Sequence, residues 1–134
     1  MRRKWLRAIP LISTLFIIAA GAAQAASLRI SGTAGYLSEW ELNGEVIEKK
    51  SGEARELSGP LVWKHVGLCS VNGPQEKAGA IDLRIVGSGS SPHMNGTVWL
   101  EGAPCELNDE PSGASSAHMD CSSAKGIPIT LRFE

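Results

Sequence analysis

Apolar and polar residues alternate strictly in two segments of this chain, which is the pattern of a β-strand with one buried face. In residues 80–86, isoleucine and leucine occupy positions 81, 83 and 85, with aspartate and arginine between them. Residues 127–133 repeat the pattern, and Pro128 marks the beginning of that strand or a sheet edge. No stretch keeps helical spacing for three turns, so the pattern predicts an all-β chain.

Weaker alternation predicts further strands elsewhere in the chain. Fifteen Gly and seven Pro supply the turns that many short strands require. Two Ser- and Gly-containing segments, 51–60 and 87–92, are interpreted as loops. The remaining strands are expected at residues 28–31, 36–42, 45–49, 61–66, 94–100, 103–108 and 117–122.

Two dipeptides predict tight hairpin turns. Asn43-Gly44 is the strongest short-range hairpin signal, and a turn there places Trp40 opposite Ile47. Residues 101–102, Glu-Gly, predict a second turn. Strands joined in this way form an antiparallel meander with one apolar face per strand. We therefore expect an antiparallel barrel or two-sheet sandwich of about eight strands.

The N-terminus has the three parts of an export signal: basic residues within 2–7, an apolar run over 8–20, and small residues ending at Ala25. The apolar run is shorter than the ~20 residues of a membrane-spanning helix, so we expect cleavage and no remaining membrane anchor. Residues 1–25 are then the signal peptide, and residues 26–134 form a single periplasmic or secreted domain.

Removal of the signal makes the protein acidic. The whole chain has 13 Lys and Arg against 14 Asp and Glu. Four of the basic residues precede position 26, so nine remain against fourteen and the formal charge is −5. Nucleic acid demands a basic surface, so we expect no nucleic-acid partner.

Three cysteines lie after the signal, in a compartment where disulfides persist. Cys105 and Cys121 are symmetric about Gly113, so a hairpin folding back there places them face to face. A disulfide between them contributes about 3 kcal/mol on the chain-entropy estimate. Cys69 is then left over, and we interpret it as a buried thiol, with a reactive thiol, a metal ligand or a dimer bridge as alternatives.

The chain lacks the common catalytic motifs. It contains no nucleophile elbow, no phosphate-binding glycine loop and no Cys-x-x-Cys pair. Glu39 and Glu41 flank Trp40 and, in a strand, project from the face opposite the core. A glycosidase needs two carboxylates facing each other across a substrate. We therefore interpret both as solvated and expect no enzymatic activity.

Histidines beside sulfur-containing residues suggest a copper site as an alternative. His-Met pairs occur at 93–94 and 118–119, and a His shortly precedes both Cys69 and Cys121. Adjacent strand residues point to opposite faces, however, so a His and its neighbouring Met do not readily bind one ion. We expect no metal and no other cofactor.

Three tryptophans remain after the signal. Trp40 and Trp63 fall on expected core faces, where they pack or line a ligand mouth. Trp99 falls on the outer face of its strand, because Val98 and Leu100 take the core side. An exposed indole usually marks contact with a partner, so Trp99 is a candidate partner-binding residue.

The start of the mature chain resembles that of small periplasmic inhibitors of secreted zinc metalloproteases. The resemblance lies in Ala26-Ser27-Leu28-Arg29-Ile30 followed by Trp40-Glu41-Leu42. It implies an eight-stranded β-barrel with one disulfide, and insertion of Ala26, Ser27, Leu28 and Arg29 into the cleft of a secreted protease. The cysteine spacing departs from that family, whose disulfide lies earlier in the chain.

These observations predict a small exported, non-enzymatic binding protein. The leading hypothesis is a protease inhibitor that acts through residues 26–29 as a free segment on a rigid barrel. A periplasmic copper-binding protein and a structural surface-associated domain without a ligand are the alternatives.

Overall fold

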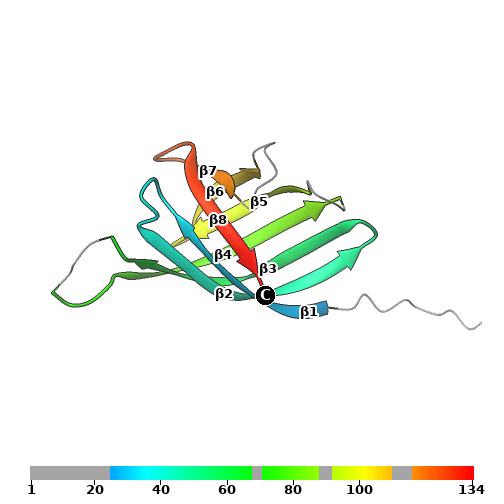
Figure 1. Ribbon diagram of the computed structural model, residues 1–134, viewed down its shortest axis with the longest axis horizontal. Helices are drawn as coiled ribbons and strands as arrows, with labels where there is room; N and C mark the ends of the chain where they lie inside the picture. The colour runs from blue at the N-terminus through cyan, green and yellow to red at the C-terminus, as the bar shows by residue number, and fades with distance from the viewer. Residues whose placement is uncertain (1–24, 68–70, 88–91, 110–115) are drawn as a thin grey trace, which may run out of the picture.

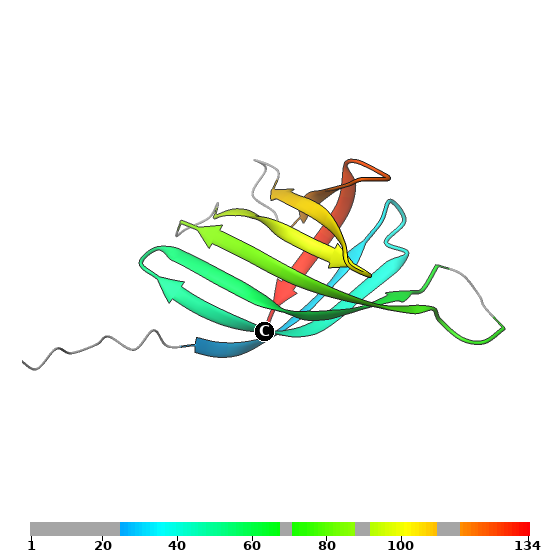
Figure 2. The same ribbon diagram turned by 180° about the vertical axis from the view of Figure 1, so that it is seen from behind.

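The computed structural model describes residues 25–67, 71–87, 92–109 and 116–134. Each strand pairs antiparallel with its neighbours along the chain, and the last strand pairs with the first to close a barrel (Figures 1 and 2). The prediction of an all-β antiparallel fold is confirmed, in its barrel form. The eight strands are β1 (Ala25–Ala34), β2 (Trp40–Ser51), β3 (Ala54–His65), β4 (Glu76–Val86), β5 (His93–Leu100), β6 (Ala103–Asp109), β7 (Ser116–Cys121) and β8 (Ile127–Phe133).

Alternate residues of every strand point into the barrel. An eight-stranded barrel is just wide enough for side chains to fill its interior. The two segments with the strictest alternation behave as predicted, since Ile81, Leu83 and Ile85 are buried, as are Ile129 and Leu131. The largest fully buried side chains are Ile30, Leu42, Leu57, Leu61, Ile81, Leu83, Leu107, Ile129, Leu131, Val46 and Val98.

The hairpin predicted at Asn43-Gly44 is wrong, because both residues lie inside the continuous strand β2. Trp40 therefore pairs with Ala34 and His65, and not with Ile47. Gly44 allows β2 and β3 to approach each other closely, because a β-carbon at position 44 would overlap the carbonyl oxygen of Pro60.

The β2–β3 turn lies instead at Gly52-Glu53, where Gly52 has a φ of 62°. Residues 54–60, predicted as a loop, belong to β3; all of them pair with β4, and residues 54–58 also pair with β2. Pro60 is tolerated there because the β2–β3 pairing skips it: the register passes from Gly44–Leu61 to Ile47–Ser58. A proline has no N–H to donate to the ladder at that point.

Other strand limits also differ from the prediction, among them the start of β4, which lies at Glu76 and not at residue 80. The segment predicted as a strand from residue 36 is a loop up to Trp40, with Tyr36 and Leu37 exposed. Strand β1 is longer than expected, because it runs through Ala25–Ala34. The turn predicted at 101–102 is confirmed, with φ of 50° at Glu101 and 82° at Gly102.

Several predictions fall on residues that the structure does not describe, namely the first 24 residues of the signal peptide predicted over 1–25, Cys69 and the turn around Gly113. Within the described part of the chain there is no helix long and apolar enough to cross a membrane.

Candidate functional site

The barrel has a cavity of about 260 Å³ at the end where the β1–β2 and β7–β8 connections lie. These two connections come from distant parts of the chain and lie side by side (Figures 1 and 2). The lining is mainly aromatic, aliphatic and sulfur-containing, and its principal members are Tyr36, Trp40, Trp63, Leu100, Cys105, Met119, Cys121 and Ile127.

Trp63 lines this cavity and is 3% exposed. Its indole nitrogen lies against Gly79 of β4, where a β-carbon would overlap it. Within the described residues, this N–H is buried and has no hydrogen-bond partner. A buried donor without a partner costs about 1–3 kcal/mol, and this nitrogen is packed against Gly79, which is not among the described residues that line the cavity.

Trp40 stands beside Trp63 at the cavity. The two rings meet edge to face, with centroids 6.4 Å apart and planes at 76°. His65 packs against Trp40 in the same manner at 4.6 Å, and the ammonium of Lys77 lies 5.8 Å from the Trp40 ring centroid. That ammonium also pairs with Glu101 at 3.0 Å. The two indoles therefore form a rigid wall whose outer neighbours are polar.

Glu39 is the single charged member of the lining, among the residues that the structure describes. Its carboxylate accepts a hydrogen bond of 2.9 Å from the backbone N–H of Leu37. Hydrogen bonds from its own N–H and from that of Leu37 lower the pKa of Glu39 below its ordinary value. The carboxylate lies against Gly35, whose φ of 102° favours glycine. Glu39 is therefore held ionised at the cavity, which corrects its interpretation as a merely solvated strand residue.

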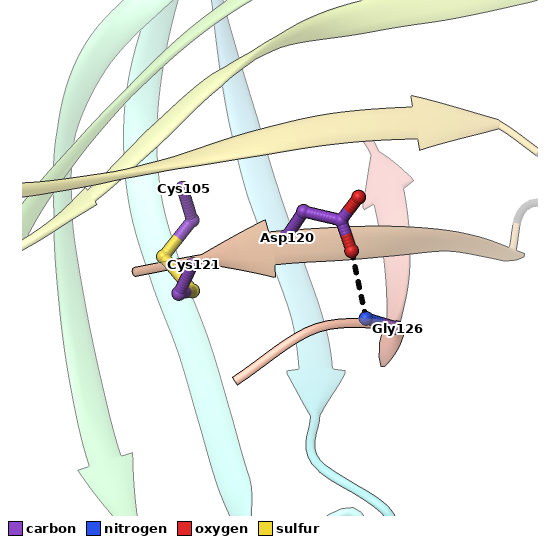
Figure 3. The surroundings of a disulfide bond; sticks show 4 residues. All are labelled: Cys105, Asp120, Cys121 and Gly126. Carbon is purple, nitrogen blue, oxygen red and sulfur yellow. Dashed lines mark hydrogen bonds between the residues drawn. A yellow bond between two sulfur atoms is a disulfide. The ribbon is translucent and has the colours of Figure 1, made fainter. Parts of the chain in front are cut away.

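Three hydrogen bonds fix the connections around the cavity. The Tyr36 hydroxyl donates to the carbonyl of Lys125 at 3.0 Å, and the Gly35 N–H donates to the carbonyl of Pro128 at 2.9 Å. In the β7–β8 turn, the Gly126 N–H donates to the carboxylate of Asp120 at 2.8 Å (Figure 3). The loop that contributes Tyr36 and Glu39 is thus tied to the opposite side of the barrel.

The predicted disulfide between Cys105 and Cys121 is present and lines the same cavity (Figure 3). The two residues are directly paired on β6 and β7, with Cα atoms 4.2 Å apart. The bridge therefore joins two adjacent strands and holds their inner faces at the cavity wall.

The segment 26–29, predicted as free, is paired with residues 45–48 as part of β1. The Ser27 hydroxyl donates a hydrogen bond to Glu45, and Leu28 packs against the core. Backbone bonds of 2.9 Å in both directions join Arg29 to Glu134. The premise of a free segment is therefore wrong, because strand pairing holds these residues to the barrel.

Trp99 lies on the outer face, since its neighbours Val98 and Leu100 belong to the core side. It is half-buried and pairs with Ala80 and Pro104. This position is next to the 101–102 turn, at the cavity end of the barrel, whereas Ala26 lies near the opposite end. The structure therefore does not bring Trp99 together with residues 26–29.

The residues proposed for copper do not converge. Met119 is buried inside the barrel while His118, its neighbour, takes the other face, and His93 is exposed near Asp109. Cys121 has no thiolate to offer because it forms the disulfide. In the parts of the chain that are described, no three His, Cys, Asp or Glu side chains group as a metal site.

Sequence reasoning missed Tyr36 and Glu39 as parts of the site, and it missed the contact of Gly79 with Trp63. Tyr36 and Glu39 were assigned to a strand, although Gly35 just before them marks a turn. The role of Gly79 depends on a neighbour 16 positions away, Trp63, so no local pattern indicates it. Comparison with protein-family models, with curated proteins and with solved structures gives no match.

Proposed function

We propose that this chain is an exported, non-enzymatic binding protein that holds a small, largely apolar ligand in the cavity beside Trp40 and Trp63. The observation that supports it is the largely apolar and aromatic lining of this cavity, in which Glu39 is the single charged side chain among the described residues. An apolar concavity that contains a small number of precisely placed polar groups is characteristic of ligand pockets.

The size of the cavity limits the ligand. Pockets for drug-sized molecules measure roughly 300–1,000 Å³, and this cavity measures about 260 Å³. A single aromatic ring with short substituents is therefore a reasonable occupant. The rigid aromatic wall and the disulfide form the pocket before binding, so little conformational entropy is lost on association.

The disulfide also bears on where such a protein works. Disulfides persist in oxidising compartments such as the periplasm and the extracellular space, and Cys105 and Cys121 are bridged. The signal-like residues 1–25 add to this proposal of a periplasmic or secreted location.

Binding is tested by titrating the disulfide-intact chain with small phenols in isothermal calorimetry and ligand-observed NMR. Trp40→Leu removes an aromatic face from the cavity wall, so affinity should fall by about fivefold, as loss of one aromatic contact implies. Trp99→Leu is the matched control, because Trp99 lies on the outer face. Equal affinity of both variants, or no binding of any compound, would contradict the proposal.

A second candidate function is inhibition of a secreted zinc protease through the start of β1. Strand β1 pairs with β8 only from Ile30 onward, so in the described structure residues 25–28 pair with β2 alone. An extended partner chain can add to an exposed strand edge of this kind through backbone hydrogen bonds. The backbone N–H and carbonyl of Arg29 bond to Glu134. Backbone groups two residues apart on a strand point to the same side, so those of Ser27 point to the edge of β1 that β8 leaves unpaired.

Inhibition is tested with a panel of zinc proteases and the variant Ser27→Pro, which removes the N–H on the open edge. This variant should lose inhibition, whereas Ser27→Ala should retain it. Unchanged inhibition by Ser27→Pro, or no inhibition of any protease by the parent chain, would reject this second function.

A further inference from the structure

We infer that the cavity is selective for a small aromatic molecule with a positively charged amine, which it binds with the amine beside Glu39 and the ring against Trp40. This inference rests on the proposed function, and it adds the chemical class of the ligand. It follows from the arrangement of one carboxylate and several aromatic rings in one cavity.

The negative charge comes from Glu39. Among the described residues that line the cavity, no other side chain is charged. Within the described residues, Glu39 forms no ion pair with Lys or Arg. The nearby ammonium of Lys77 does not neutralise it, because that group is paired with Glu101 at 3.0 Å. A cationic ligand is therefore the natural partner of this carboxylate.

The carboxylate remains charged over the pH range in which an aliphatic amine is protonated. Hydrogen bonds from its own backbone N–H and that of Leu37 lower the pKa of Glu39, with a further lowering from His65. One of its oxygens accepts the Leu37 N–H, and an ionised carboxylate has about four acceptor positions. Glu39 can thus accept hydrogen bonds from a ligand without giving up its contact with the loop.

Aromatic rings accompany the carboxylate. Tyr36 and Trp40 line the same cavity as Glu39, and aromatic faces attract cations by about 0.5–2 kcal/mol, depending on desolvation. The mature formal charge of −5 favours the approach of a cation as well. Carboxylate and aromatic groups together form the chemistry that recognises an amine.

Four probes that share one ring test this inference on the disulfide-intact chain. Tyramine has both the hydroxyl and the ammonium, phenethylamine lacks the hydroxyl, 4-ethylphenol lacks the charge, and 3-(4-hydroxyphenyl)propionate has a negative charge. Calorimetry should show tyramine binding at least tenfold more tightly than 4-ethylphenol, and the propionate binding most weakly. Salt at 0.5 M should reduce the advantage of tyramine over 4-ethylphenol, because it screens the ion pair.

Variants test the role of the carboxylate. Glu39→Gln should remove the preference for tyramine over 4-ethylphenol, since glutamine keeps the acceptor for Leu37 and loses the charge. Glu41→Gln is the matched control on the exposed outer face of β2.

The outcomes distinguish the inference from the proposed function. Equal binding of tyramine and 4-ethylphenol, or tighter binding of the propionate, overturns the selectivity for amines and leaves a ligand-binding cavity. Loss of amine preference in Glu41→Gln as well as in Glu39→Gln also overturns the role of Glu39. No binding of any of the four probes counts against the proposed function itself.

Discussion

Arg55 donates two hydrogen bonds, each 2.9 Å long, to the carboxylate of Glu48. Both residues face the barrel interior at the end away from the cavity, where β2 and β3 meet their turn. Glu48 is 4% exposed, whereas the Arg55 side chain remains 39% exposed and the ammonium of Lys50 approaches Glu48 at 3.7 Å. The arginine thus supplies the two hydrogen bonds of a buried carboxylate whose other cation, Lys50, lies farther away.

Arg55→Ala should lower the free energy of unfolding by about 1–3 kcal/mol, because it leaves a buried carboxylate without its two hydrogen bonds. Urea denaturation of the disulfide-intact chain measures this. Arg84→Ala is the control, since Arg84 and Glu56 form an exposed pair at 3.8 Å and such pairs contribute at most about 1 kcal/mol. Equal losses in the two variants would show that the Arg55 pair is no stronger than a surface contact.

The same pair makes stability depend on pH. Hydrogen bonding from Arg55 is the main cause that lowers the pKa of Glu48, and burial opposes it. A lowered folded-state pKa gives stability that is present above the ordinary glutamate pKa and is lost as the pH falls through the folded value. Urea midpoints measured from pH 7 down to pH 3 should therefore decrease less in Glu48→Gln than in the parent. Parallel pH profiles would contradict this.

Loss of the disulfide should destabilise the barrel. Cys105 and Cys121 are 16 positions apart, and closing a loop of that size contributes about 3 kcal/mol on the chain-entropy estimate. Replacing both by Ser, in a Cys69→Ser background that prevents other pairings, should shift the urea midpoint accordingly. The single variant Cys69→Ser is the control. A midpoint unchanged by the double replacement would mean that strand pairing alone holds β6 to β7.

Gly79→Ala should lower the free energy of unfolding by about 1–3 kcal/mol, as overpacking of a filled interior does. The added carbon would overlap the Trp63 indole nitrogen and the carbonyl oxygen of Trp99. Ala78→Val adds carbon at a neighbouring exposed position and should change stability by about 0.5 kcal/mol or less. Thermal unfolding followed by tryptophan fluorescence measures both. A tolerated Gly79→Ala would show that Trp63 has room to move.

Deletion of residues 26–29 should destabilise the folded chain, because it removes the pairing of β1 with residues 45–48 and the packing of Leu28. We expect a loss of about 1–3 kcal/mol, the value of burying one such side chain. Hydrogen exchange should show faster exchange in the β2 segment that loses its partner. Arg29→Ala keeps the backbone and should leave stability nearly unchanged. An equally stable deletion variant would indicate that the segment is held only weakly.

Alternation found the strands whose inward positions are apolar, as in β4 and β8. It failed over residues 54–60 of β3, where Arg55 points inward and makes the segment look polar on both faces. Gly44 led to the wrong prediction of a hairpin. In the local sequence, a glycine that lets two strands approach closely cannot be told from a glycine in a hairpin turn.

The disulfide was predictable because it depends on the symmetry of one hairpin. The cavity was not, since its wall joins Tyr36 to Lys125 across 89 positions and sets Trp63 against Gly79 on the next strand. Such contacts depend on how the barrel closes, and no pattern within a single strand encodes them.

The order of the strands also bears on the route by which the chain folds. Seven of the eight strand interfaces join strands that are consecutive in the sequence, so each can form as a hairpin with a small loss of chain entropy. The interface between β1 and β8 joins residues 30–34 to residues 129–133, about 100 positions apart, and has no such local route. We therefore expect the meander to assemble first and the meeting of the two chain ends to be the slow, late event in folding.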